Sequence, residues 1–183
     1  MKLAFLSILL GAALAASAQP ARVILIRHAE KPDDAKNQHL SDEGRDRAQR
    51  VVKWLSEGKV LDTNGAPAAL YAAAPTARGR SVRCVETLEP TALNLGLTIR
   101  TPYQADDYAR LAHDLLHDET LRGKNVVVCW VHDYLPQFAS SLGVKPAPPK
   151  WKGEDFESAY VVTFPHGKTK LEYAEEKLKK KKK

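Results

Sequence analysis

Two histidines in the sequence stand beside charged residues in a way that could support chemistry. Arg27-His28 and His132-Asp133 each pair an imidazole with a charged neighbour, and Arg83 adds a further cation. A neutral imidazole can act as a nucleophile, and a guanidinium group can bind an anion through two parallel hydrogen bonds. An arginine directly before a histidine therefore favours an anionic substrate, although one such pair alone also fits an ordinary surface turn.

Two apolar segments must position these residues, and each is expected to be a buried strand. Residues 23–26 lead directly into Arg27-His28, and residues 126–131 lead into His132. Short β-branched runs are typical of buried parallel strands. Because ligands bind beyond the carboxyl ends of strands in open α/β sheets, we expect both histidines at one edge of the sheet.

The rest of the chain alternates predicted strands and helices. Ser41 is expected to cap a first long helix, which carries an apolar stripe. Further predicted helices cover 82–95, 106–121 and 136–142, and predicted strands cover 69–74, 98–100, 159–164 and 170–173. This alternation predicts an α/β fold, a three-layer sandwich with a mostly parallel central sheet flanked by helices and an antiparallel edge hairpin near the C-terminus.

Both ends of the chain differ in composition from the middle. Residues 1–18 combine Met1-Lys2, an apolar stretch and a final Ala-Ser-Ala, which is the pattern of a signal peptide cleaved before Gln19. The apolar run is too short to span a bilayer. We therefore expect a protein exported to the periplasm or the medium, with one domain over 19–176 and a basic tail over 177–183.

The basic character of the chain resides in that tail. Its six lysines equal the formal net charge of +6, so the rest of the sequence is close to neutral. A tail of this kind can contact anionic surfaces, but a solvated end is the commoner use of such a run. No aromatic residues are interleaved with a basic stripe, so the sequence does not support nucleic-acid binding. The shortness of the apolar run over 1–18 likewise gives no support to a membrane span.

Several other polar residues are expected to be structural. Glu43, Arg45 and Arg47 are most simply an exposed face of the first helix. His113 and His117 have the i, i+4 spacing of paired metal ligands, but a nearby third ligand is missing from the sequence. We therefore expect a surface pair and no metal site.

The cysteines and tryptophans also have structural interpretations. Cys84 and Cys129 are expected to be free or buried thiols, although export would permit a disulfide and the sequence leaves this open. Trp54, Trp130 and Trp151 are expected to pack in the core or at its edge. Trp130 is close enough to the second histidine to line a pocket instead.

In the order of its motifs, the chain resembles the histidine phosphatase superfamily, which has the phosphoglycerate-mutase-like fold. The residues that carry the resemblance are Arg27-His28-Ala29-Glu30, Leu40-Ser41-Asp42-Glu43-Gly44 with Arg47-Ala48, Arg83 with Thr87, and His132 after an apolar strand. The resemblance spans nearly the whole mature chain. Lys31 stands where the acid phosphatase and phytase branch has an arginine, and the chain is too short for the helical insertion of that branch, so it is similar to the small phosphatases.

The resemblance implies a mechanism for each residue. His28 would be the nucleophile and form a phosphohistidine intermediate that water then hydrolyses. Arg27 and Arg83 would bind the phosphoryl oxygens, and His132 would donate to the same oxygens. Lys31 would be either a third cation or a solvated side chain. The resemblance implies no metal and no cofactor, because the cations are supplied by the chain.

The proton donor and the register of the arginine loop stay open. Asp133 is the first candidate donor because it adjoins the second histidine, and its alternative role is to cap a helix. Glu30 and Asp106 are the other candidate donors. Arg80 could replace Arg83, although Arg83 has the family's spacing to Thr87.

The predicted function is hydrolysis of a small phosphorylated substrate. One alternative is a phosphomutase or phosphotransferase, which must protect its phosphohistidine from water. The other is a non-catalytic protein that binds a phosphorylated ligand on the same fold. The presence of both histidines and Arg83 favours the enzyme.

Overall fold

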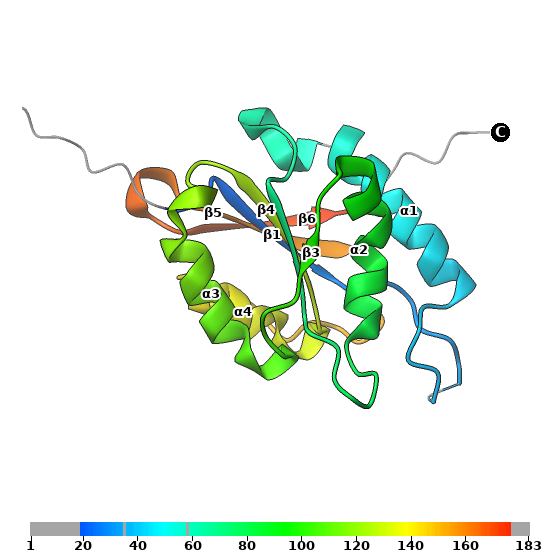
Figure 1. Cartoon of the computed structure of the whole chain (residues 1–183). Coiled ribbons are helices and arrows are strands. Elements are labelled where there is room, and N and C mark those ends of the chain that lie inside the picture. Colours follow the sequence, from blue (N-terminus) through cyan, green and yellow to red (C-terminus); the bar gives the residue numbers. More distant parts are fainter. Residues whose placement is uncertain (1–18, 35, 58, 177–183) are drawn as a thin grey trace, which may run out of the picture.

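A six-stranded sheet in the order β3-β2-β4-β1-β5-β6 organises the molecule (Figure 1). Strands β1 to β4 are parallel, β5 runs antiparallel to β1, and β6 pairs antiparallel with β5, so that the last two strands form a C-terminal hairpin at one edge. The predicted fold class is confirmed. The strands are β1 (Arg22–Arg27), β2 (Ala69–Ala72), β3 (Ile99–Arg100), β4 (Asn125–Trp130), β5 (Ser158–Thr163) and β6 (Lys170–Glu175).

This computed structural model describes residues 19–34, 36–57 and 59–176. The expected signal peptide over 1–18, the basic tail over 177–183 and Gly58, the expected end of the first helix, lie outside the described residues. Within the described part of the chain, no helix has the length and apolar character that crossing a membrane requires.

Four helices cover the two faces of the sheet: α1 (Asp42–Glu57) and α2 (Val82–Leu95) pack together on one face, and α3 (Tyr108–His117) and α4 (Leu135–Ser141) on the other (Figure 1). The central strands contribute the core, since Val23 to Ile26 and Val126 to Trp130 are fully buried. Burial on both faces explains why these strands are continuously apolar rather than alternating.

The helix expected over 106–121 is broken into three parts. Short 3-10 turns, η2 (Ala105–Asp107) and η3 (Glu119–Leu121), flank α3. The break follows His117, because Asp118 is extended and its carboxylate accepts hydrogen bonds from the backbone and the hydroxyl group of Thr120. Such local side-chain bonding competes with the helix.

The start of α1 is fixed against the loop that follows β1. Ser41 caps the helix as expected, because its Oγ accepts a hydrogen bond from the backbone nitrogen of Gly44 at 3.0 Å. The Ser41 backbone nitrogen donates to the carbonyl oxygen of Glu30 at 3.0 Å. A Cβ atom at Gly44 would lie 2.3 Å from that same oxygen, so only glycine permits this approach.

The expectation that Arg47 is exposed is wrong. Glu43 and Arg45 do face solvent, but Arg47 is 1% exposed and donates to the carboxylate of Glu176 at 2.6 Å. Arg47 lies three and four residues from Gly44 and Val51, which are also buried, so it belongs to the core face of α1. The pairing carboxylate comes from the residue after β6, which the sequence pattern of α1 does not reveal.

The cysteines and the tryptophans lie in the core. Cys84 and Cys129 are free thiols, and both side chains are fully buried. Burial raises the pKa of Cys129, as does its contact with Cys84. Trp130 is fully buried and donates to the carbonyl oxygen of Ala105, so it packs in the core and does not line the cavity described below.

Candidate active site

A cavity of about 360 Å³ opens at the carboxyl end of the parallel strands. The register explains why residues far apart in sequence meet there, because Arg27 pairs with Trp130 across β1 and β4. The residues that follow these two strands are therefore neighbours. The cavity is lined by residues from five segments: His28, Gln38, Thr76, Arg80, Ser81, Arg83, Gln104, Ala105, Asp106, Val131, Asp133 and Tyr134.

The imidazole of His28 is held in one tautomer. Its Nδ1 lies 2.7 Å from the carbonyl oxygen of Ala29, and because a carbonyl can only accept, Nδ1 carries the hydrogen and Nε2 keeps its lone pair. Burial lowers the pKa of His28 to about 3, against the hydrogen bond to Ala29, and the charges of Arg27 and Arg83 lower it further. At neutral pH, His28 is therefore an uncharged imidazole with its Nε2 lone pair available.

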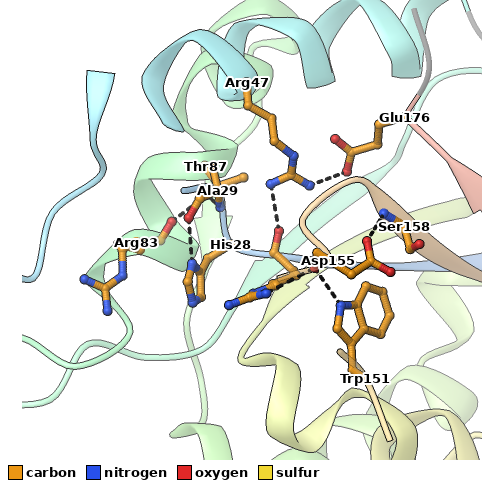
Figure 2. A network of polar contacts seen from close by, with 10 residues as sticks. His28, Ala29, Arg47, Arg83, Thr87, Trp151, Asp155, Ser158 and Glu176 are labelled. Carbon is orange, nitrogen blue, oxygen red and sulfur yellow. Dashed lines mark hydrogen bonds and ion pairs between the residues drawn. The ribbon is translucent and has the colours of Figure 1, made fainter. Parts of the chain in front are cut away.

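A chain of hydrogen bonds links this histidine to α2. Thr87 lies on α2, and its Oγ1 accepts from the backbone nitrogen of Ala29 at 2.8 Å and donates to the carbonyl oxygen of Arg83 at 2.7 Å (Figure 2). The peptide that holds His28 is thus fixed to the first turn of α2. The same turn carries Arg83, so one set of hydrogen bonds fixes the position of the candidate nucleophile relative to the backbone of this arginine.

Arg83 and Arg80 both reach the cavity. Arg83 is half-buried and donates to the carbonyl oxygen of Asn37 at 3.1 Å, whereas Arg80 is exposed. Among the described residues, neither guanidinium forms an ion pair with a carboxylate. Ser81, between them, has a φ of 69°, a left-handed conformation that is strained for a residue other than glycine.

Arg27 is placed differently from the other two arginines. It is 2% exposed, and its Nη1 donates to the carbonyl oxygens of Gly153 and Asp155. The ring of Phe156 covers the guanidinium group at 3.7 Å. Burial lowers the pKa of Arg27 to about 10, so its charge persists at neutral pH. Its buried Nε has no hydrogen-bond partner among the described residues.

His132 and Asp133 lie in the short 3-10 turn η4 (His132–Tyr134), directly after β4. The Nε2 of His132 is 3.5 Å from the Asp133 carboxylate, and its buried Nδ1 has no partner in the described part of the chain. Burial lowers the pKa of His132, as does Arg27, while Asp133 raises it. Lys31 is exposed, and its charge also lowers the pKa of His132, which places this lysine near the histidine but outside the cavity lining.

The three candidate proton donors are now separated by position. Asp133 and Asp106 both line the cavity. Glu30 does not; burial raises its pKa, and its charged neighbours Arg47 and Arg50 lie on α1. The alternative capping role of Asp133 is wrong, because no side-chain hydrogen bond caps η4 or α4 in the described residues.

Several residues at the site were not found from the sequence. Gly153, Asp155 and Phe156 contact Arg27 although they lie in a loop without a recognisable pattern. The sequence signal of Thr87 is limited to its spacing from Arg83. Gln38 and Tyr134 line the cavity but belong to residue types that are common on any surface. Apart from Thr87, Phe156 alone of these residues has a sequence signal, because it is an aromatic residue within a polar loop.

The histidines with the spacing of paired metal ligands, His113 and His117, lie away from this cavity. His113 and His117 stack on the exposed face of α3 with their ring centroids 4.2 Å apart. In the part of the chain that the structure describes, no group of three or more His, Cys, Asp or Glu residues could hold a metal ion.

Comparison with solved structures identifies the fold. The chain is 17% identical to a mycobacterial glucosyl-3-phosphoglycerate phosphatase with inorganic phosphate, with a TM-score of 0.56 over 83% of this chain and 95% of that one. It is 13% identical to a protein described as an alpha-ribazole-5'-P phosphatase from Escherichia coli, with a TM-score of 0.59 over 86% and 97%. A mutant phosphoserine phosphatase from Entamoeba histolytica in complex with phosphoserine gives 14% identity and a TM-score of 0.52 over 82% and 94%.

These proteins are members of the histidine phosphatase superfamily, so the chain has the histidine phosphatase fold, as its motifs indicated. No family model and no curated protein sequence matches it. At this level of identity the likeness concerns the fold, and the chemistry must be argued from the side chains.

Proposed function

We propose that the protein is a phosphomonoester hydrolase that acts through a phosphohistidine intermediate on His28. The observation that carries the proposal is the hydrogen bond from Nδ1 of His28 to the Ala29 carbonyl oxygen, combined with the strongly lowered pKa of this histidine. Together they leave the Nε2 lone pair available at neutral pH, inside a cavity that the cationic side chains of Arg80 and Arg83 also line. An uncharged imidazole can attack phosphorus, whereas an imidazolium cannot.

Cationic and donor groups around His28 fit a phosphoryl group. Arg83 lines the same cavity, and Arg27 and His132 each have a buried nitrogen without a partner among the described residues. Buried polar atoms are normally satisfied, and phosphoryl oxygens would accept from both nitrogens. Their charge would stabilise the negative charge of the transferring group. In this proposal, Lys31 contributes long-range attraction rather than a direct contact.

The mechanism has two steps. Nε2 of His28 attacks phosphorus, the bond from phosphorus to the ester oxygen breaks, and Asp133 protonates the leaving oxygen. Water then attacks the phosphohistidine, the bond from phosphorus to Nε2 breaks, and Asp133 accepts the proton from the water, so that phosphate and free His28 are restored. Asp106 is the alternative donor because it lines the same cavity.

The alternative functions make different demands on the site. A mutase must keep water away from the phosphohistidine while the substrate reorients, whereas Asp106, Asp133 and Arg80 are all exposed around this cavity. A non-catalytic binder would not need the tautomer of His28 to be fixed. The exposed cavity and the fixed tautomer of His28 therefore favour hydrolysis over both alternatives.

Export is part of the proposal. The succession of basic, apolar and small residues over 1–18 supports a mature protein that begins at Gln19. N-terminal sequencing of protein recovered from separated cell fractions tests it. Intact chain in the cytoplasm would contradict this part of the proposal without affecting the chemistry.

The activity is tested with a panel of phosphomonoesters, including sugar phosphates, phosphoserine and p-nitrophenyl phosphate. Rapid quenching with alkali, followed by acid treatment, should reveal an acid-labile phosphoprotein. Release of phosphate with a trapped phosphohistidine supports the proposal. Phosphate binding without turnover on any substrate would favour the binding protein instead.

A further inference from the structure

The loop between α4 and β5 encloses the guanidinium group of Arg27. Nη1 of Arg27 donates to the carbonyl oxygen of Gly153 at 2.6 Å and to that of Asp155 at 3.1 Å. The ring of Phe156 lies 3.7 Å from the guanidinium carbon. The same ring contacts His28, with the two ring centroids 6.2 Å apart in an edge-on arrangement. One loop therefore contacts both members of the Arg27-His28 pair.

The loop is itself anchored to the hairpin. Trp151 is 4% exposed, and its ring packs against that of Tyr160 on β5 at 4.7 Å. Its Nε1 donates at 2.8 Å to the same Asp155 carbonyl oxygen that accepts from Arg27 (Figure 2 shows the bond to Trp151). The Asp155 carboxylate accepts from the backbone nitrogen of Ser158 at 3.0 Å. The groups that hold Arg27 are thus fixed by the core.

The contacts use one part of the guanidinium group and leave another part available. A guanidinium group has five N–H donors, and the two carbonyl oxygens occupy both hydrogens of Nη1. Nε is buried without a hydrogen-bond partner among the described residues. The hydrogen bonds that the Arg27 side chain makes within that part of the chain both come from Nη1, so Nη2 makes none there. Nε and Nη2 together form the edge that can bind two oxygens of a phosphoryl group in parallel.

We infer that Phe156 is a positioning residue for Arg27: with the Gly153 and Asp155 carbonyl groups, it orients the Nε and Nη2 edge of the guanidinium towards the phosphoryl group on His28. The inference rests on the proposed function and adds a residue to it. Phe156 acts through two effects. Its ring attracts the guanidinium by a cation–π interaction, which is stronger at a desolvated site, and it restricts rotation of the side chain.

The test is a set of matched variants at this ring. Phe156→Leu removes the π system and keeps an apolar side chain, Phe156→Tyr keeps the ring, and Tyr173→Leu removes an aromatic contact on the hairpin away from Arg27. Binding of inorganic phosphate is measured by calorimetry, and kcat and KM are measured with p-nitrophenyl phosphate. We expect Phe156→Leu to weaken phosphate binding about 5- to 30-fold, the effect of a desolvated cation–π contact. Phe156→Tyr and Tyr173→Leu should bind phosphate like the wild type.

The outcomes separate positioning from packing. A loss of thermal stability in Phe156→Leu with unchanged phosphate affinity would overturn the inference, as would a Phe156→Tyr variant as weak as Phe156→Leu. If Phe156→Leu does not fold, Phe156→Met is measured in the same way. A wild-type protein that neither binds phosphate nor hydrolyses esters would refute the proposed function and this inference with it. An active wild type with an unaffected Phe156→Leu variant would refute the inference alone.

Discussion

Arg47 and Glu176 form a buried ion pair that joins the middle of α1 to the residue after β6. The Arg47 Nη2 to Glu176 Oε1 distance is 2.6 Å, and the side chains are 1% and 3% exposed. Figure 2 shows this pair. Arg47 also donates from Nη1 to the carbonyl oxygen of Arg27 at 3.3 Å. The pair therefore connects the residue that follows β6 to the strand that carries the site.

The first prediction concerns the pH dependence of stability. Burial raises the pKa of Glu176 from 4.5 to about 7, although Arg47 lowers it in part. The folded state binds the proton of the Glu176 carboxyl group more tightly than the unfolded state does. The stabilisation that this proton gives the folded state is therefore complete below about pH 4.5 and is lost as the pH rises to about 7. The loss amounts to roughly 3 kcal/mol of unfolding free energy at most.

Urea unfolding of Glu176→Gln at several pH values measures this contribution. The variant mimics the protonated side chain, so it should match the wild type near pH 5 and, because the raised pKa of Glu176 makes the ionised form the less stable one, equal or exceed its stability at pH 8. Glu172→Gln, an exposed position on β6, is the control and should follow the wild type. A variant much less stable than the wild type at pH 8 would mean that the ion pair is a net stabilising contact.

The second prediction concerns the nucleophile. His28→Ala should lower turnover by more than about 1000-fold and abolish the acid-labile phosphoenzyme, because it removes the nitrogen that forms the proposed intermediate. His28 lies at the end of β1 beside the cavity, so the variant should stay folded by circular dichroism. His113→Ala, which changes an exposed histidine on α3, should be fully active. Near-normal turnover in His28→Ala would exclude the covalent mechanism.

The third prediction distinguishes the two cavity arginines. Arg83→Ala should lower kcat/KM on the order of 100-fold and weaken inhibition by inorganic phosphate, since it removes a group that stabilises the transferring charge. Arg80→Ala should have a much smaller effect, because Arg80 is exposed on the loop before α2. Steady-state kinetics with and without phosphate measure both. The reverse order would assign the phosphate contact to Arg80.

The fourth prediction identifies the proton donor. As a general acid, Asp133 must be protonated when the leaving group departs, so the rate should fall on the alkaline side of the pH profile. Asp133→Asn cannot donate a carboxylic proton, and it should lose most activity on alkyl phosphates but little on p-nitrophenyl phosphate, whose leaving group needs no proton. Thermal stability should be unchanged.

Asp106→Asn is the matched variant for that measurement, because Asp106 lines the same cavity. A leaving-group dependence that follows Asp106 would transfer the role to that residue. Equal loss on both substrates in Asp133→Asn would indicate that His132, 3.5 Å from the Asp133 carboxylate, has been displaced.

The sequence by itself determined the fold class and the meeting of the two histidines. Runs of apolar residues that end in Arg27-His28 and His132 must be buried parallel strands, and the carboxyl ends of such strands share one edge of the sheet. The N-cap at Ser41 and the helix from Val82 followed from local chemistry of the same kind. These features depend on residues that are near one another in the chain, so they can be recognised from the periodic pattern of the sequence.

Only the tertiary structure decided the environment of each side chain. Arg47 has the sequence signal of an exposed helix residue, but Glu176, 129 positions away, makes its burial possible. Arg27 is expected to bind phosphate, and its guanidinium group also contacts carbonyl groups and a ring from residues 153–156. Long-range contacts of this kind leave no periodic trace, because a loop's backbone carbonyl groups are the same whatever its sequence, so packing alone determines what they hold.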